Sequence, residues 1–337
     1  MAHHDRFRLR KQVQGRSSFL SWGTVVPDRD IKVFTEVSDQ VRLLQRRGLR
    51  IDDEAVARSL LDGISYYRLS GYWYPFRDWN PDRTRSERFR EGVRLEHVVS
   101  LSGFDRALRV RVFDALGRVE LAVRAVLGHE LGRLHPEAHL RRSLLDPQID
   151  IVRYERWLDR YEVAIADSRE DFVVHHRQRY GGRLPVWAAV ELLDWGGLSY
   201  LYQFAPIARR DAVAQHFGPI TSAQFASWLR ALNVLRNWCA HHARMWNRAV
   251  AISAKLPQHG AVPDLDHLRG TEKRVFHLLG ITQYLLRTVS PEGTQILPDL
   301  LARFPRVPYL SLRQMGCPDD WQKQRLWSPI PKGTIRG

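Results

Sequence analysis

The sequence predicts an all-α fold, and three features of the chain support this prediction. Apolar residues recur at helical spacing along most of the chain, while the strict alternation typical of half-buried strands is nearly absent. Prolines and paired glycines separate the helical segments and indicate where each one ends. The chain has no internal repeat of solenoid length. We therefore expect a helical bundle.

Helix-breaking residues and charged stretches divide the chain into segments. The basic residues 1–30 predict a flexible arm, and the charged, turn-rich residues 78–92 predict an exposed loop. Pro136 would terminate a long helix, and Pro147 would lie in the first turn of the next. Helices are expected over about 33–49, 52–64, 97–134, 145–167, 172–180, 185–193, 198–206, 209–217, 222–248 and 271–288.

The C-terminal part differs from the rest, because seven of the 17 prolines lie from Pro291 onward. Such a density excludes a long helix and predicts short helices with an extended tail. We accordingly expect four regions. They are a basic arm over 1–30, an N-terminal helical region over 31–135, a second helical region over 136–290, and short helices with a tail over 291–337.

Composition narrows the class of protein. The 337 residues carry a net charge of +15, and all but six of the 52 basic residues are arginine, whose planar fork suits phosphate. We expect a polyanionic partner, most simply nucleic acid. Two cysteines exclude a disulfide scaffold and a four-cysteine zinc site. The absence of a long apolar run or an apolar leader predicts a cytoplasmic protein without membrane contact.

Side chains that can transfer protons or bind phosphate are most concentrated in residues 235–248, LRNWCAHHARMWNR. If the helix over 222–248 is continuous, Asn237, His241, Arg244 and Arg248 share one face, and Arg236 flanks it. This face combines an amide, an imidazole and guanidinium groups with no nearby carboxylate. Such a set suits cleavage of RNA by its own 2′-hydroxyl, because histidine moves protons at neutral pH and arginine holds the phosphoryl group. No metal or other cofactor is expected.

The segment over 235–248 resembles the signature of the Abi-like abortive-infection proteins, the AbiD/AbiF group of the HEPN superfamily. Four further blocks agree in order along the chain, so the resemblance spans nearly all of it. They are ISYYRLSGYWYPF with the helix before it, FDRALRVRVFDALGRVELAVRAVLGHELG, LPVWAAVELLDWGGLSYLY and MGCPDDWQKQRLW.

The resemblance implies a HEPN-like helical bundle with additional N- and C-terminal helices, acting in antiphage defence as a metal-independent endoribonuclease. It also implies a homodimer that pairs two motifs, and control by a noncoding RNA. Arg236, Asn237 and His241 match the catalytic motif, and the family's continuation matches Arg244, Asn247 and Arg248. The next residue, His242, offers a longer spacing, but the helical wheel places it on the core side, so we favour His241.

Two further sets of residues each allow a functional and a structural interpretation. Arg124 and His129 could form a second motif, although Arg124 can also pair with Glu120 one helical turn earlier. Arg68 and Arg77 lie in an aromatic block that could stack on unpaired bases or simply pack in the core. The alternative function is a noncatalytic RNA-binding or sensing protein, and the third class is a purely structural helical protein.

Overall fold

A computed structural model describes residues 32–329, so the arm predicted over 1–30 lies outside the described residues. The fold is all-α, as predicted, with one two-stranded hairpin in the described part. The main elements are α1 (Val37–Arg46), α2 (Glu54–Gly63), α3 (Tyr66–Trp73), β1 (Arg77–Trp79), β2 (Arg85–Phe89), α4 (Leu95–Gly132), α5 (Ile151–Asp167), α6 (Asp171–Arg179), α7 (Val186–Ala189), α8 (Trp195–Phe204), α9 (Ile207–His216), α10 (Ser222–Ala240), α11 (Pro263–Asp266), α12 (Val275–Val289) and α13 (Ile296–Ala302).

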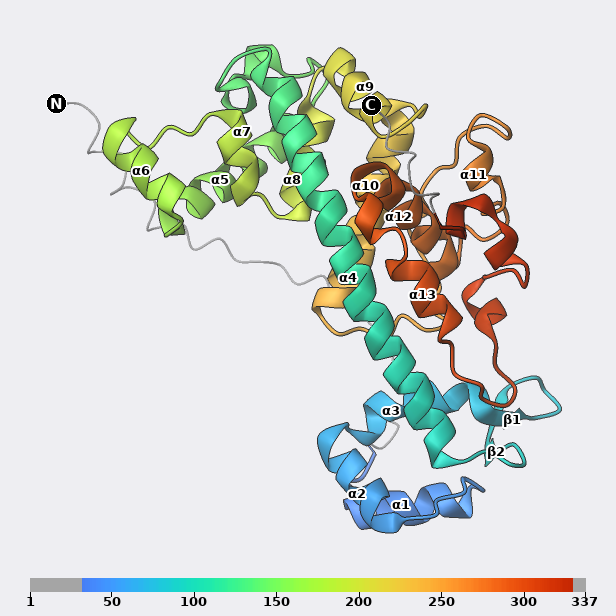
Figure 1. Cartoon of the computed structure of the whole chain (residues 1–337). Helices are drawn as coiled ribbons and strands as arrows, with labels where there is room; N and C mark the ends of the chain where they lie inside the picture. Colours follow the sequence, from blue (N-terminus) through green and yellow to red (C-terminus); the bar gives the residue numbers. More distant parts are fainter. Residues whose placement is uncertain (1–31, 330–337) are drawn as a thin grey trace.

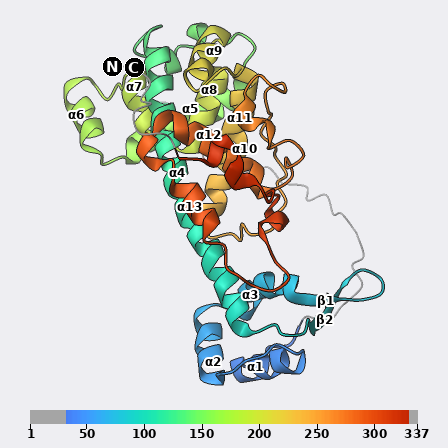
Figure 2. The same ribbon diagram turned by 45° about the vertical axis from the view of Figure 1, so that its right-hand side comes forward.

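The 38-residue helix α4 forms the axis of the molecule (Figures 1 and 2). It packs against α3 near its start, α10, α12 and α13 along its middle, and α7 and α9 near its end. Its buried face repeats every three or four residues, as an amphipathic helix requires. This face contains Val98, Leu101, Leu108, Val112, Ala115, Val119, Val123, Leu127 and Leu131.

The N-terminal elements gather at one end of α4 (Figure 1). Asp53 caps α2 by accepting hydrogen bonds from two backbone N–H groups of its first turn. The loop expected over 78–92 is instead an antiparallel hairpin of β1 and β2. Long-range contacts hold this polar hairpin, because the carbonyl of Arg47 accepts from the N–H of Phe89 at 2.8 Å. The local sequence does not reveal this pairing.

The helices α5 to α9 gather at the other end of α4 (Figure 1). The helix expected from residue 145, with Pro147 in its first turn, begins later, at Ile151, and Asp150 caps it. Gly128 permits the close packing of α7 on α4, since a Cβ there would lie 3.1 Å from the Cα of Trp187. Beyond Pro291 the described chain forms short helices, as the proline density predicted. Within residues 32–329, no helix has both the length and the apolar character needed to cross a membrane.

Candidate functional site

The helix that carries the motif ends earlier than its sequence suggests. We expected it to continue to about Arg248, but α10 ends at Ala240 and His241 is its C-cap. His242 adopts a left-handed backbone with φ of 54°. The N–H groups of His242 and Ala243 bond back to the carbonyls of Cys239 and Trp238, which is the Schellman pattern. The single polar helix face predicted through Arg244 and Arg248 therefore does not exist.

A buried carboxylate on α4 determines where the chain turns. Asp105 accepts hydrogen bonds from the backbone N–H groups of Met245 at 3.0 Å and Trp246 at 2.6 Å. Its other oxygen accepts from the Tyr72 hydroxyl and forms a buried ion pair with Arg109. Burial and the neighbouring Asp105 raise the pKa of Tyr72 to about 12. This network fixes the segment after the motif against α3 and α4.

Two arginines tie the same segment to α3. Arg68 donates to the carbonyl of His242 at 2.6 Å, and Arg244 donates to the carbonyl of Gly71. A Cβ at position 71 would lie 3.0 Å from Nη1 of Arg244, so glycine allows this approach. Both arginines thus contact the backbone of this part of the site, and neither forms an ion pair with a carboxylate within residues 32–329.

The catalytic candidates lie at the exposed end of α10. The guanidinium of Arg236 lies over the ring of Phe113, 5.5 Å from its centroid, and its Nε is buried without a hydrogen-bond partner. Asn237 and His241 are exposed and lie one turn apart, since the N–H of His241 bonds to the carbonyl of Asn237. The three predicted catalytic residues are therefore close neighbours, with two of them open to solvent.

The helical wheel predicts His242 on the core side, but the structure exposes it to solvent. The wheel fails there because the helix has already ended, and the left-handed turn exposes His242. Its side chain lines a cavity of about 960 Å³ between α2, α3, α4 and the end of α10. Within the described chain, no hydrogen bond or ion pair fixes the ring of either His241 or His242.

This cavity combines apolar walls with cations, which suits a ligand with both bases and phosphates. Its guanidinium groups come from Arg68, Arg106 and Arg109. The sequence did not single out the two arginines of α4. The spacing of Asp105 and Arg109, four residues apart on the apolar face of a predicted helix, indicates an ion pair but does not place either arginine of α4 at a cavity. The apolar walls include Leu60, Ile64, Leu69, Val99, Val110 and Phe113.

The remaining candidates have other partners. The guanidinium of Arg248 lies over the ring of Trp238 at 4.3 Å, and the side-chain oxygen of Asn247 accepts from Arg274 at 3.2 Å. Arg77 lies in β1, and no hydrogen bond or ring contact joins it to residues 236–248 in the described part of the chain. The structure therefore brings Arg68 to the motif but does not bring Arg77 there.

The possible second motif lies elsewhere on α4. Arg124 pairs with Glu120 and Glu191 and donates to the carbonyl of Leu193 at 2.9 Å, so it links α4 to the chain before α8. It follows Arg109 by fifteen residues, which corresponds to about 22 Å along the helix. His129 is exposed one further turn away. These two residues do not join the cavity beside α10.

Thiol and metal chemistry find little support at this site. Burial raises the pKa of the Cys239 thiol to about 12, so the thiol stays protonated at neutral pH. Its sulfur lies 3.6 Å from the sulfur of Met245. Within residues 32–329, no three histidine, cysteine, aspartate or glutamate side chains form a group that could hold a metal ion.

Comparison with known proteins links this arrangement to one family. The family model described as Abi-like protein matches residues 59–247, which is more than half of the chain. The match includes α3, the whole of α4 and all of α10, so it spans the elements that form the cavity and its motif. Searches among curated proteins and among solved structures return no match.

Proposed function

The chain belongs to the Abi-like protein family, and on this premise we propose that it is an antiphage abortive-infection protein that cleaves RNA without a metal ion. The family suggests the defence role. The proposed activity, a HEPN-type endoribonuclease, rests on one observation. Arg236 and two accessible histidines lie beside a cavity large enough for a nucleotide, which is also lined by Arg68, Arg106 and the Asp105-paired Arg109.

The reaction would use the RNA as its own nucleophile. The 2′-oxygen would attack the adjacent phosphorus while a histidine, His241 in our assignment, accepts its proton. The bond from phosphorus to the 5′-oxygen would break, and that oxygen would take up a proton. The products would be a 2′,3′-cyclic phosphate and a 5′-hydroxyl end. Arg236 would stabilise the charge on the phosphoryl oxygens, and Asn237 would orient His241 or donate to phosphate.

A homodimer would complete such a site. One proton acceptor and one proton donor are needed, and two copies of the motif supply both. The rim of the cavity beside Arg236 supports this arrangement, because Val110 and Phe113, which line the cavity, are also 63% and 43% exposed. A second copy of the chain would cover these apolar side chains and bring the two α10 ends together. We also propose that the protein acts in the cytoplasm and that a noncoding RNA controls it.

The alternative is a noncatalytic RNA-binding or sensing protein of the same family. One observation favours it, since no hydrogen bond within the described residues orients the ring of His241 or His242. In that case Arg68, Arg106 and Arg236 would hold phosphates without cleavage. Both functions require RNA binding that weakens strongly with salt.

The deciding experiment is cleavage of a labelled mixed RNA in EDTA by the wild type, His241→Ala and His242→Ala. We expect cyclic-phosphate ends from the wild type and a loss of at least about 100-fold in rate for His241→Ala with RNA binding kept. A loss confined to His242→Ala would assign the proton transfer to His242. Binding without cleavage by all three proteins would favour the noncatalytic alternative.

A further inference from the structure

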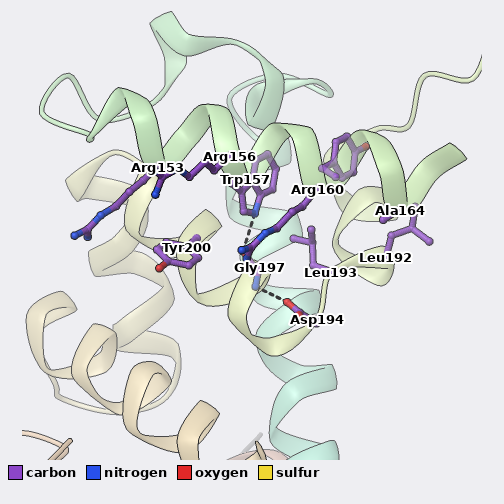
Figure 3. Close-up of a pocket in the computed structure, with 11 residues that line it drawn as sticks. Arg153, Arg156, Trp157, Arg160, Ala164, Leu192, Leu193, Asp194, Gly197 and Tyr200 are labelled. Carbon is purple, nitrogen blue, oxygen red and sulfur yellow. Dashed lines mark hydrogen bonds between the residues drawn. The ribbon is translucent and has the colours of Figure 1, made fainter. Parts of the chain in front are cut away.

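A second cavity with basic walls lies far from the motif, between α5 and the start of α8 (Figure 3). Its volume is about 440 Å³. Arg153, Arg156 and Arg160 of α5 line one side, and Tyr200 of α8 faces them across the cavity (Figure 3). The predicted function does not use any of these residues.

Two of the three arginines that line this cavity have no carboxylate partner within residues 32–329. Arg153 pairs with Asp150, but Arg156 and Arg160 form no ion pair or hydrogen bond within residues 32–329. The one carboxylate that lines the cavity is Asp194, whose Oδ1 caps α8 by accepting from the N–H of Gly197 at 2.6 Å. The cavity therefore presents a net positive charge that an anion would neutralise.

The three arginines form a row rather than a ring. Their spacing of three and four residues places them on one side of α5, and the row extends about 10 Å along the helix axis. A nucleic acid strand carries one phosphate for about every 3.4 Å of helix rise. The row thus spans about three such intervals, so each arginine can contact a phosphate of the same strand, whereas a single phosphate would use only part of the row. This geometry favours a linear polyanion.

Buried aromatic side chains form the floor of the cavity. Trp157 is buried, donates from its indole N–H to the carbonyl of Gly197 at 2.9 Å, and stacks on Tyr161 with 5.5 Å between ring centroids. Tyr200 stacks on Phe204 with 6.1 Å between ring centroids and is 38% exposed, so part of its ring is accessible to a base. A charged row beside an accessible aromatic ring is the combination by which proteins hold single strands without reading their sequence.

We propose that this cavity is a second RNA-binding surface, which holds the backbone of single-stranded RNA on Arg156 and Arg160 while the motif at α10 acts on another part of the strand. The inference rests on the proposed function, because it assumes RNA as the substrate. It adds a contact that would make affinity depend on RNA length, since α5 and the motif lie toward opposite ends of α4 (Figure 1).

The test measures binding of a fluorescent 20-nucleotide single-stranded RNA by the full chain carrying His241→Ala, so that cleavage does not interfere. The variant of the second cavity, called the groove variant, adds Arg156→Gln and Arg160→Gln. The matched control adds Arg303→Gln and Arg306→Gln, which remove the same charge from two exposed, unpaired arginines of the described chain. Dissociation constants are measured over a range of salt concentrations, and AMP is tested as a competitor in parallel.

We expect the groove variant to bind RNA at least about 10-fold more weakly at low salt and to lower the slope of log affinity against log salt by about 1.4, which corresponds to two phosphates. The control variant should leave the slope unchanged. Equal effects of both variants, or none from the groove variant, would overturn the proposal. So would AMP binding that depends on Arg156 and Arg160 without any RNA effect, because the ligand would then be a free nucleotide.

The two proposals can fail separately. RNA binding that is unchanged in the groove variant, together with cleavage that depends on His241, removes the second surface and leaves the nuclease. Weaker RNA binding in the groove variant, without cleavage by the wild type, removes the nuclease and leaves the surface.

Discussion

Asp105 of α4 accepts a hydrogen bond from the backbone N–H of Trp246 at 2.6 Å, across 141 residues of chain. The same oxygen accepts from Met245, and the second oxygen holds Arg109 and Tyr72. These bonds hold the segment that follows the motif helix and its Schellman turn against α4. Folding stability and the geometry of the site therefore depend on one buried carboxylate.

Asp105→Ala should lower the free energy of unfolding by about 3–5 kcal/mol, because it leaves the Arg109 guanidinium buried without a carboxylate. It also leaves two buried backbone N–H groups without their acceptor. Urea denaturation followed by circular dichroism measures the change.

The control is Asp114→Ala on the same helix. Asp114 forms an i,i+4 pair with Arg118, and both side chains are more than a third exposed, so the loss should be about 1 kcal/mol or less. Equal losses in the two variants would show that the Asp105 network does not have the stabilising role assigned to it.

Local signals explain why most helices could be predicted from the sequence. Asp53 caps α2, Gly48 follows α1 with a left-handed backbone, and apolar residues recur along α4. Each of these signals acts within a few residues, so it can be recognised in the local sequence. The hairpin of β1 and β2 and the end of α10 could not be predicted in this way. Residues 241–256 contain no glycine or proline, and the carboxylate that holds the segment after the helix lies on another helix.

The same distinction applies to the candidate site. Arg236, Asn237 and His241 could be found because they are close in sequence and remain close in space. Arg106 and Arg109 could not, since only the packing of α4 beside α10 brings them to the cavity. His242 was placed on the wrong side because a helical wheel has no meaning beyond the last helical residue.

Arg68→Ala should loosen the turn that carries the two histidines. Arg68 donates to the carbonyl of His242 at 2.6 Å, and a hydrogen bond from a charged group contributes about 1.5–3 kcal/mol. We expect amide hydrogen exchange at residues 241–246 to rise at least about 10-fold, measured by mass spectrometry. Arg106→Ala is the control, because it removes a charge from the same cavity without a backbone contact. Equal exchange rates at residues 241–246 in the two variants would show that Arg68 does not hold this turn.

His139 should make the protein sensitive to mild acid. Burial lowers the pKa of His139 to about 4, and its Nε2 lies 3.1 Å from the Tyr161 hydroxyl. The unfolded chain takes up the proton near pH 6.5 while the folded chain does not, so stability falls as pH decreases from 6.5 to 4. The contribution is about 3 kcal/mol over this range.

His139→Gln can keep a polar contact with Tyr161 but cannot be protonated. The wild type should therefore lose about 3 kcal/mol more than the variant between pH 6.5 and pH 4 in urea unfolding. Carboxylates titrate in the same range in both proteins, so the difference between the two curves isolates the histidine. Parallel curves would show that His139 does not stay neutral in the folded protein.

The apolar outer face of α4 provides the last prediction. Val110 and Phe113 are exposed beside Arg236, and burying both against a second copy would remove apolar surface from water at the point where two motifs must meet. Val110→Asp with Phe113→Asp should convert a dimer to a monomer in sedimentation velocity. RNA cleavage should be lost while the helical circular dichroism is kept, and because both residues also line the cavity, RNA binding by the variant is measured separately to distinguish loss of the dimer from damage to the cavity. Val163→Asp, at a residue of α5 that is 59% exposed, should change neither property. A wild type that sediments as a monomer and still cleaves RNA would mean that one chain supplies both the proton acceptor and the proton donor, and His242 would then be the first residue to test for the second role.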